Sequence, residues 1–291
     1  MIYTLRQQRT LARKVQLEGF GFWSGNDVQV EFRPAEEHTG IVFVRADLNP
    51  PQRIPATIEH RTETPRRTTL AAGGACVEMV EHVLAALVGM RVDNCEIWVN
   101  NVEMPGCDGS SKAFVEAIQQ AGTVQQYATK PRLLVIEPIH VGDDDAWVEV
   151  EPSDSHWSVK YQLDYGEFTP IGRQTLQLDM TPDSFARDLA PARTFLLKQE
   201  AEWLRQQGLG QRTTFKDVLV FDDHGPIENE LRFEDECVRH KTLDLVGDLA
   251  LAGCDLVGSF VAHRSGHRLN GELVKALLRE GQILDQLRRS A

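Results

Sequence analysis

The sequence contains Val28-Gln-Val-Glu-Phe-Arg-Pro34 and, in its second half, Ala146-Trp-Val-Glu-Val-Glu-Pro152, two stretches of the same pattern. In each stretch apolar and polar residues alternate until a proline ends the run. A turn containing Gly and Asp precedes each stretch, and a second alternating run follows it at 41–45 and at 159–163. A period of two bounded by turn residues predicts half-buried antiparallel strands.

Helical patterns follow these strands in both halves of the chain. Apolar residues three and four apart predict a helix over 77–87, which ends near Gly89. Signals at the ends, above all a following glycine, place further helices over 110–121, 199–207 and 233–252. In each half of the chain strands come first and helices follow. This order predicts an α+β protein built by duplication of one α+β unit. We expect domain I over 1–127 and domain II over 131–291, joined by the polar, proline-ended linker 127–131.

Composition limits the classes of partner. The chain has 291 residues, 42% of them hydrophobic, and 43 acidic against 31 basic residues give a net charge of −12. Such a charge disfavours nucleic acid and anionic lipid as partners. The longest apolar run, 83–90, is far shorter than the roughly 20 residues of a membrane span, and the N-terminus has no signal-peptide core. We expect a cytoplasmic protein without stable membrane insertion, whose oligomeric state the sequence leaves open.

His240 and Asp244 are the first candidate pair for chemistry. They lie four apart in the helix predicted over 233–252, so their side chains share one face, and Asp248 lies one turn further along it. At this spacing an imidazole and a carboxylate can reach one zinc ion. A solvated ion pair without function is the alternative that the spacing leaves open.

Glu81 and His82 are adjacent in the otherwise apolar helix predicted over 77–87. Neighbouring helical side chains diverge by about 100°, so this pair can flank a metal, with His82 as a ligand and Glu81 reaching the water on it. A buried structural histidine beside a surface glutamate is the alternative. His267 follows the apolar strand predicted over 256–262, in the predicted loop 265–267, where a lone histidine usually has no function.

Taken together, these residues suggest a metal-assisted amide hydrolase. Two histidines and one aspartate leave a fourth zinc position open for water, whose pKa zinc lowers to about 7. Glu81 would take its proton as general base, His267 would protonate the leaving amine, and Asp248 would hold the imidazole in the required tautomer. The hypothesis requires that the two helices meet, which the sequence does not show.

At these residues the sequence strongly resembles a known family, over nearly the whole chain from about residue 9 to residue 277. The family is that of the bacterial UDP-3-O-acyl-N-acetylglucosamine deacetylases, the zinc enzymes of lipid A biosynthesis. VEH, RHKTLD and SGH in this order make the resemblance specific. The matching segments are RTLARKVQLEGFGFWSG, FRPAEEHTGIVFVRADLNP, VEHVLAAL, EMPGCDGS, ARTF, LRFEDECVRHKTLDLVGDL and SGHRLN.

The resemblance implies a role for each matching position. Glu81 matches the general base, His267 the acid, and Asp248 the carboxylate that supports it. The family fold is two α+β domains, with helices sandwiched between two sheets and zinc at their junction, in agreement with the duplication expected above. The positions that match the zinc ligands are His82, His240 and Asp244.

Further matches concern the substrate, an acylated UDP-sugar. Thr194 matches the residue that stabilises the tetrahedral oxyanion, and Phe195 matches its neighbour at the active site. Lys241 matches a lysine near the phosphates of the substrate, where Arg264 is also available. Iron(II) suits two histidines and one carboxylate nearly as well as zinc does.

Three positions depart from the family pattern. Trp23 replaces a histidine near the active site, the stretch 211–218 replaces a glycine-rich loop that helps to line the acyl passage, and Ala146 replaces a basic residue. Two alternatives therefore stay open, a paralogue acting on another N-acetylated sugar conjugate and a zinc-binding relative without catalysis. Retention of Glu81 argues against the second, because a structural zinc site is closed and four-coordinate.

Overall fold

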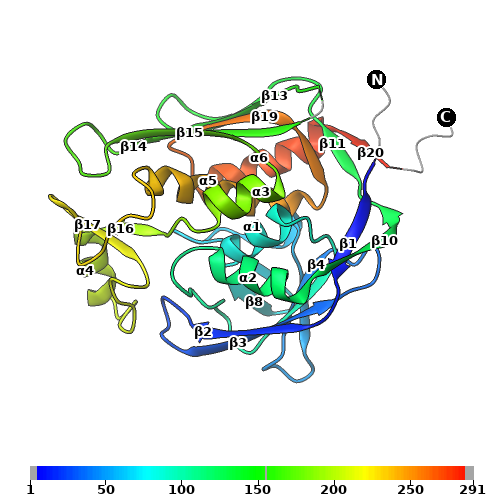
Figure 1. Ribbon diagram of the computed structural model, residues 1–291, viewed down its shortest axis with the longest axis horizontal. Coiled ribbons are helices and arrows are strands. Elements are labelled where there is room, and N and C mark those ends of the chain that lie inside the picture. The colour runs from blue at the N-terminus through cyan, green and yellow to red at the C-terminus, as the bar shows by residue number, and fades with distance from the viewer. Residues whose placement is uncertain (1–4, 155, 286–291) are drawn as a thin grey trace.

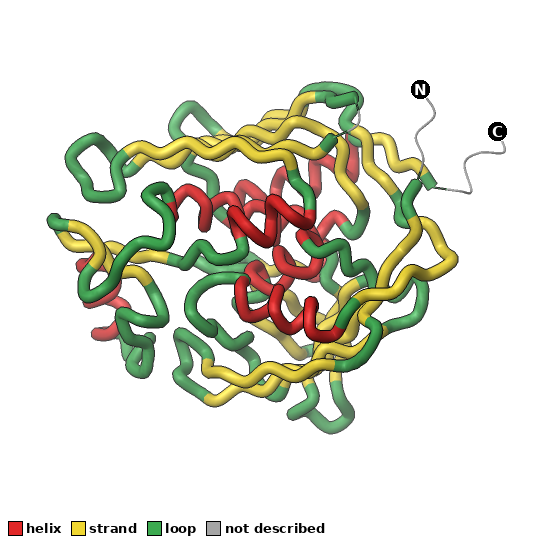
Figure 2. Tube along the Cα trace, viewed as in Figure 1, coloured by secondary structure: helices red, strands yellow, loops and turns green. Residues whose placement is uncertain are grey.

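The computed structural model describes residues 5–154 and 156–285, and its fold is mixed α+β, as predicted (Figure 1, Figure 2). No helix in these two ranges is long and apolar enough to cross a membrane. The α-helices are α1 (Glu81–Gly89), α2 (Lys112–Ala121), α3 (Pro182–Ser184), α4 (Lys198–Gln206), α5 (Glu236–Leu249) and α6 (His267–Glu280); shorter helical turns are η1 (Ile58–His60), η2 (Phe185–Leu189) and η3 (Ala250–Ala252).

Sheet I comes from the first half of the chain and has the strand order β2-β3-β9-β4-β5. β3 (Asp27–Pro34) contains the strand predicted at 28–34, and its residues alternate between exposed and buried, as expected for a strand with one face on the core. β3 is antiparallel to both β2 and β9, whereas β9 and β4 are parallel. The other strands are β2 (Val15–Phe20), β4 (Ile41–Arg45), β5 (Gln52–Pro55) and β9 (Cys95–Val99).

Sheet II comes from the second half and contains the order β12-β13-β19-β14-β15. β13 (Trp147–Glu151), the strand predicted at 146–152, is antiparallel to both β12 and β19, whereas β19 and β14 are parallel. β11 adds to β19, and β20 adds to β11. These strands are β11 (Arg132–Leu134), β12 (Ile139–Gly142), β14 (Trp157–Asp164), β15 (Arg173–Asp179), β19 (Asp255–His263) and β20 (Gln282–Leu284).

Smaller sheets flank these two. β1 (Gln7–Leu11) pairs with β10 (Thr123–Thr129), so residues 127–129 of the predicted linker belong to a strand instead. The backbone pairing of Thr129 with Gln7 is the reason. The remaining strands are β6 (Arg61–Thr62), β7 (Thr69–Ala72), β8 (Ala75–Glu78), β16 (Phe195–Leu197), β17 (Leu219–Asp222) and β18 (Gly225–Pro226).

The helices join the two halves of the chain. α1 packs against α5, α5 also contacts β14 and β15 of sheet II, and α2 contacts β2 of sheet I. In Figure 1 the strands β13, β14 and β19 run along the top of the molecule, and β2 and β3 run along the bottom. The buried faces of these elements form one continuous hydrophobic cluster.

One predicted helix begins too early. The prediction over 77–87 includes two residues of β8, where Val77 pairs with Leu70 of β7, and α1 begins only at Glu81. Met79 has a φ of 60°, a left-handed conformation that no α-helix contains, so the chain must turn there before the helix starts. The helices predicted over 110–121 and 199–207 are confirmed as α2 and α4, and the one over 233–252 as α5 followed by η3.

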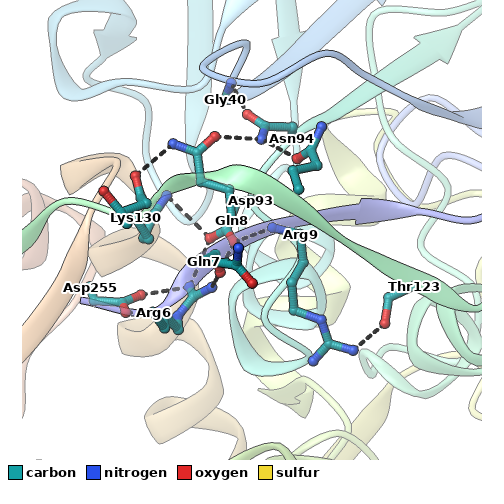
Figure 3. A network of polar contacts seen from close by, with 12 residues as sticks. Arg6, Gln7, Gln8, Arg9, Gly40, Asp93, Asn94, Thr123, Lys130 and Asp255 are labelled. Atoms are coloured by element: carbon teal, nitrogen blue, oxygen red, sulfur yellow. Dashed lines mark hydrogen bonds and ion pairs between the residues drawn. The ribbon is translucent and has the colours of Figure 1, made fainter. Parts of the chain in front are cut away.

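A cluster of charged side chains, the Arg6 cluster (Arg6, Asp93, Lys130 and Asp255), ties the two halves together away from the helices (Figure 3). Arg6 donates two hydrogen bonds to Asp93 and two to Asp255, all at 2.7–2.8 Å. Lys130 Nζ lies 3.3 Å from Asp93 Oδ1. Paired guanidinium–carboxylate bonds of this kind are among the stronger and more directional polar contacts in proteins.

Candidate active site

Glu81 and His82 occupy the first turn of α1, and both side chains are buried. Gly247 of α5 faces this turn, and a Cβ there would lie 2.1 Å from the carbonyl oxygen of Glu81. Only glycine permits so close an approach of the two helices. The approach brings His82 next to His240 and Asp244 of α5, so the two helices meet as the hydrolase hypothesis requires.

His82, His240 and Asp244 direct their ligand atoms to one point. One ligand atom from each residue lies within 4.8 Å of the others, and all three residues are buried. Asp244 Oδ1 lies 3.6 Å from His82 Nε2 and 3.3 Å from His240 Nε2, and it has no hydrogen-bond partner among the described residues. A buried polar atom without a partner is costly. Two imidazole nitrogens around such an oxygen fit a divalent metal ion.

The protonation of these groups also suits a metal. Nδ1 of His240 lies 3.1 Å from the carbonyl oxygen of Ala192, so this nitrogen carries the hydrogen and Nε2 keeps a free lone pair. Burial lowers the pKa of His240 to about 4, against the opposing charge of Asp244. Burial raises the pKa of Asp244, but His240 and Lys241 outweigh it and hold that pKa well below its usual range. Neutral imidazole and ionised carboxylate are the ligand forms that metals bind.

His267, Asp248 and Glu81 form a second group beside the first. His267 Nδ1 donates to Asp248 Oδ2 at 2.8 Å, and His267 Nε2 lies 4.0 Å from Glu81 Oε1. His267 is the first residue of α6, so the prediction that it lies in a loop is wrong. The reason is that Gly266 is the extended N-cap of the helix, and Ser-Gly before a helix has the composition of a loop.

Glu81 and His267 have pKa values displaced in the same direction. Burial raises the pKa of Glu81, and the nearby His267 and His82 oppose it. Burial lowers the pKa of His267, but Asp248 and Glu81 outweigh it and raise the pKa to about 9. A carboxylate with a raised pKa accepts a proton more readily, and an imidazole with a raised pKa carries one at neutral pH.

A cavity of about 850 Å³ opens over both groups. Thr194, Phe195, Lys241 and Arg264 all line it, so every substrate residue expected from the sequence lies at this cavity. Lys241 Nζ donates to Asp244 Oδ2 at 2.9 Å, and the Phe195 ring lies edge-on to the His240 ring at 6.4 Å. One wall is apolar and consists of Leu196, Leu204, Leu209, Phe215, Val218, Val220 and Ile227.

Residues 8–279 match the family model of UDP-3-O-acyl N-acetylglycosamine deacetylase. The chain belongs to this family. It is 40% identical to the UDP-3-O-acyl-N-acetylglucosamine deacetylase of Thioalkalivibrio sulfidiphilus (strain HL-EbGR7), over 94% of this chain and 90% of the relative. It is also 40% identical to the enzyme of the same name from Chlamydia felis (strain Fe/C-56), over 95% of this chain and 99% of the relative.

All three departures from the family pattern face the cavity. Trp23 and Ala146 line it, as do Thr213, Thr214, Phe215 and Val218 of the stretch 211–218. The indole nitrogen of Trp23 donates to Met79 Sδ at 3.1 Å, and the Arg67 guanidinium lies 5.4 Å from the Trp23 ring. The differences expected from the sequence therefore all lie at the wall of the cavity.

Sequence reasoning missed two buried polar residues at this site. Thr68 contacts Glu81, Asp248 and His267, and Asn270 donates through Nδ2 to Asp248 Oδ2 at 2.8 Å. Neither stands in a pattern that predicts a site, because Thr68 belongs to the stretch RRTTL and Asn270 lies inside a helix. Thr68 and Asn270 belong to the site only through their tertiary contacts with Glu81, Asp248 and His267.

Proposed function

We propose that this chain hydrolyses the N-acetyl amide of UDP-3-O-(3-hydroxyacyl)-N-acetylglucosamine, releasing acetate and the free amine, the committed step of lipid A biosynthesis in the cytoplasm. Membership of the deacetylase family supports the substrate. The observation that carries the chemistry is the convergence of three ligand atoms beside a glutamate and a histidine of displaced pKa.

His82, His240 and Asp244 would hold one zinc ion, or iron(II), through the two Nε2 atoms and Oδ1. The chemistry that such an ion supplies is a lowered pKa for water and polarisation of the amide carbonyl. Two observations support this assignment. Oδ1 of Asp244 has no hydrogen-bond partner among the described residues, and the Nδ1–H of His240 is directed at the carbonyl oxygen of Ala192.

Glu81 and His267 would move the protons. Glu81 Oε1 accepts one proton from the attacking water, and His267 Nε2 donates one to the amide nitrogen as its bond to the acetyl carbon breaks. The second proton of the water stays on the released acetic acid, which ionises to acetate in solution. The proton on Glu81 would return to His267 before the next turnover, so the products are acetate and an amine. Asp248 keeps the His267 ring oriented through the Nδ1 hydrogen bond, as carboxylates behind catalytic histidines do.

The remaining residues would bind the substrate. The Thr194 hydroxyl stabilises the developing oxyanion, and Phe195 with the apolar wall accommodates the acyl chain. Lys241 and Arg264 provide positive charge for the diphosphate, and their place on the cavity supports this role.

The same proposal includes two duplicated domains, 1–127 and 131–291, with helices sandwiched between sheets I and II. The terminal residues 1–4 and 286–291 of these ranges lie outside the described residues. The strand orders β2-β3-β9-β4-β5 and β12-β13-β19-β14-β15 support duplication, because both orders have one parallel pair, in the same place. A helix also precedes and follows β9, as one precedes and follows β19. The contacts of α2 with sheet I and of α5 with sheet II support the layering.

The decisive experiment measures acetate release from UDP-3-O-(3-hydroxyacyl)-N-acetylglucosamine by zinc-loaded protein, with Glu81→Gln as the matched variant. We expect turnover in the wild type and a loss of roughly 10²- to 10⁴-fold in the variant, with metal content unchanged. Zinc-loaded wild type that releases no acetate would contradict the substrate and favour another N-acetylated sugar conjugate. Full activity in the variant would contradict the role of Glu81.

A further inference from the structure

Thr68 lies between the two groups that move protons, at the start of the β7–β8 hairpin, and it is fully buried. Its backbone N–H donates to Glu81 Oε2 at 3.0 Å, and its carbonyl oxygen accepts from the N–H of Val80 at 3.4 Å. Because Oε2 is engaged, the other oxygen of Glu81, Oε1, is the one that faces His267 Nε2. The backbone of Thr68 therefore fixes which oxygen of Glu81 is free to accept a proton.

The side chain of Thr68 makes the complementary contact. Its hydroxyl donates to Asp248 Oδ1 at 2.5 Å, while Asp248 Oδ2 accepts from His267 Nδ1 and from Asn270 Nδ2, both at 2.8 Å. A carboxylate held by three donors cannot rotate without breaking one of them. The hydroxyl oxygen also lies 3.3 Å from His267 Nδ1, so a lone pair of Thr68 faces the imidazole N–H.

We propose that Thr68 is a positioning residue that fixes the proton acceptor Glu81 and the proton donor His267 relative to each other, a role that rests on the function proposed above. Glu81 belongs to α1, whereas Asp248 and His267 belong to α5 and α6. Thr68 contacts all three side chains from a fourth segment. The orientation of the donor His267 depends on the hydroxyl of Thr68, through Asp248. The orientation of the acceptor Glu81 depends on the backbone N–H of Thr68.

The chain offers a closely matched set of variants. Thr68→Val removes only the hydroxyl and keeps the backbone N–H bonded to Glu81, and Thr68→Ser keeps the hydroxyl. Thr69→Val is the control, because Thr69 is the next residue, is also buried, and has a hydroxyl without a hydrogen-bond partner among the described residues. Thermal unfolding and metal content would be measured for all three variants.

We expect Thr68→Val to lower kcat roughly 10- to 100-fold, the usual cost of losing a partner one shell from the reaction, with KM and metal content unchanged. Thr68→Ser should restore most of the turnover, and Thr69→Val should behave as wild type. Wild-type kcat in Thr68→Val would overturn the proposal. So would equal losses in Thr68→Val and Thr68→Ser, because packing rather than the hydroxyl would then be responsible.

A second readout does not depend on activity. The Nδ1 proton of His267, hydrogen-bonded to Asp248, should give a downfield proton NMR signal that His267→Ala abolishes. We expect this signal to shift or broaden in Thr68→Val and to stay in place in Thr69→Val; an unchanged signal in Thr68→Val would overturn the proposal. If the wild type releases no acetate, the proposed function fails, and this measurement still tests Thr68.

Discussion

The Arg6 cluster and the cavity cluster (Glu81, His82, His240, Asp244, Asp248 and His267) both join distant segments through charged side chains, but they differ in how completely their atoms are paired. In the Arg6 cluster both carboxylates accept two bonds from one guanidinium. In the cavity cluster Asp244 Oδ1 has two imidazole nitrogens nearby and no hydrogen bond from the described residues.

The difference predicts a structural role for the Arg6 cluster and supports the functional role proposed for the cavity cluster. In the Arg6 cluster each charge has a partner, so the removal of one member leaves another charge unpaired and destabilises the fold. Incomplete pairing leaves buried lone pairs directed at one point, which is costly unless a cation or substrate uses them. We therefore expect substitutions in the two clusters to affect different measurements.

The largest effect is expected for His82→Ala. The side chain of His82 forms no hydrogen bond within the described residues, so this substitution removes a proposed ligand and little else. We expect bound zinc to fall from one ion per chain to nearly none after dialysis. Turnover should fall by more than the roughly 10- to 100-fold that losing an outer partner costs. Metal analysis and acetate release check this, and stoichiometric zinc in the variant would contradict the ligand assignment.

Asp93→Ala, in the Arg6 cluster, should lower the stability of the fold and leave metal binding and turnover unchanged. It leaves Arg6 and Lys130 without their shared partner, and removing one member of a buried pair is strongly destabilising. We expect a loss of about 3 kcal/mol in the free energy of unfolding, the lower end of the usual range, because Arg6 keeps Asp255 and its side chain is 21% exposed. Urea unfolding measures this change. Bound zinc and kcat, measured below the unfolding transition, should match the wild type. Loss of zinc binding in Asp93→Ala would contradict the proposed difference between the two clusters.

The sequence predicted several elements of the fold and residues of the cavity cluster, but it did not predict the Arg6 cluster. Period-two alternation predicted β3 and β13, and the residues at their ends predicted α2 and α4, because these are local signals. His240 and Asp244 were predicted for the same reason, being one turn apart on a helix. The Arg6 cluster was not predicted, because Arg6, Asp93 and Asp255 meet only through tertiary pairing.

Thr68 and the start of α1 were missed for related reasons. The contacts of Thr68 with Asp248 and His267 span much of the chain, and no local pattern records them. The helix predicted over 77–87 was given too early a start because an apolar residue such as Val77 fits a strand as well as a helix. The pairing of Val77 with Leu70 places it in a strand. Local periodicity therefore identified the elements, whereas tertiary partners set their ends and completed the site.

The pH dependence of kcat should be a smaller effect, with a decline at alkaline pH. The pKa of His267 is raised to about 9, so its imidazolium, the proton donor proposed above, persists at neutral pH and is lost as the pH rises through about 9. Protonated His267 also contributes to the free energy of unfolding. That contribution is complete below about pH 6.5, the ordinary pKa of histidine, and is lost as the pH rises through about 9. We expect kcat to decline above about pH 9.

Asp248→Asn tests the cause of that shift. It removes the nearest charge that raises the pKa of His267, so the alkaline decline should move to lower pH by about one unit or more. A rate profile from pH 6 to 10 for both proteins would show this movement. A decline at the same pH in both proteins would assign it to a group other than His267.

The smallest effect is expected for Lys112→Ala, which extends the comparison to an exposed ion pair. Lys112 Nζ lies 3.8 Å from Glu116 Oε1, and the two side chains are 53% and 62% exposed. Water screens such pairs, and their contribution is usually below about 1 kcal/mol. We expect the free energy of unfolding to change by less than about 0.5 kcal/mol, measured beside Asp93→Ala in the same urea series. If both substitutions cost the same, the stability of the Arg6 cluster cannot come from burial and complete pairing, because the exposed pair has neither.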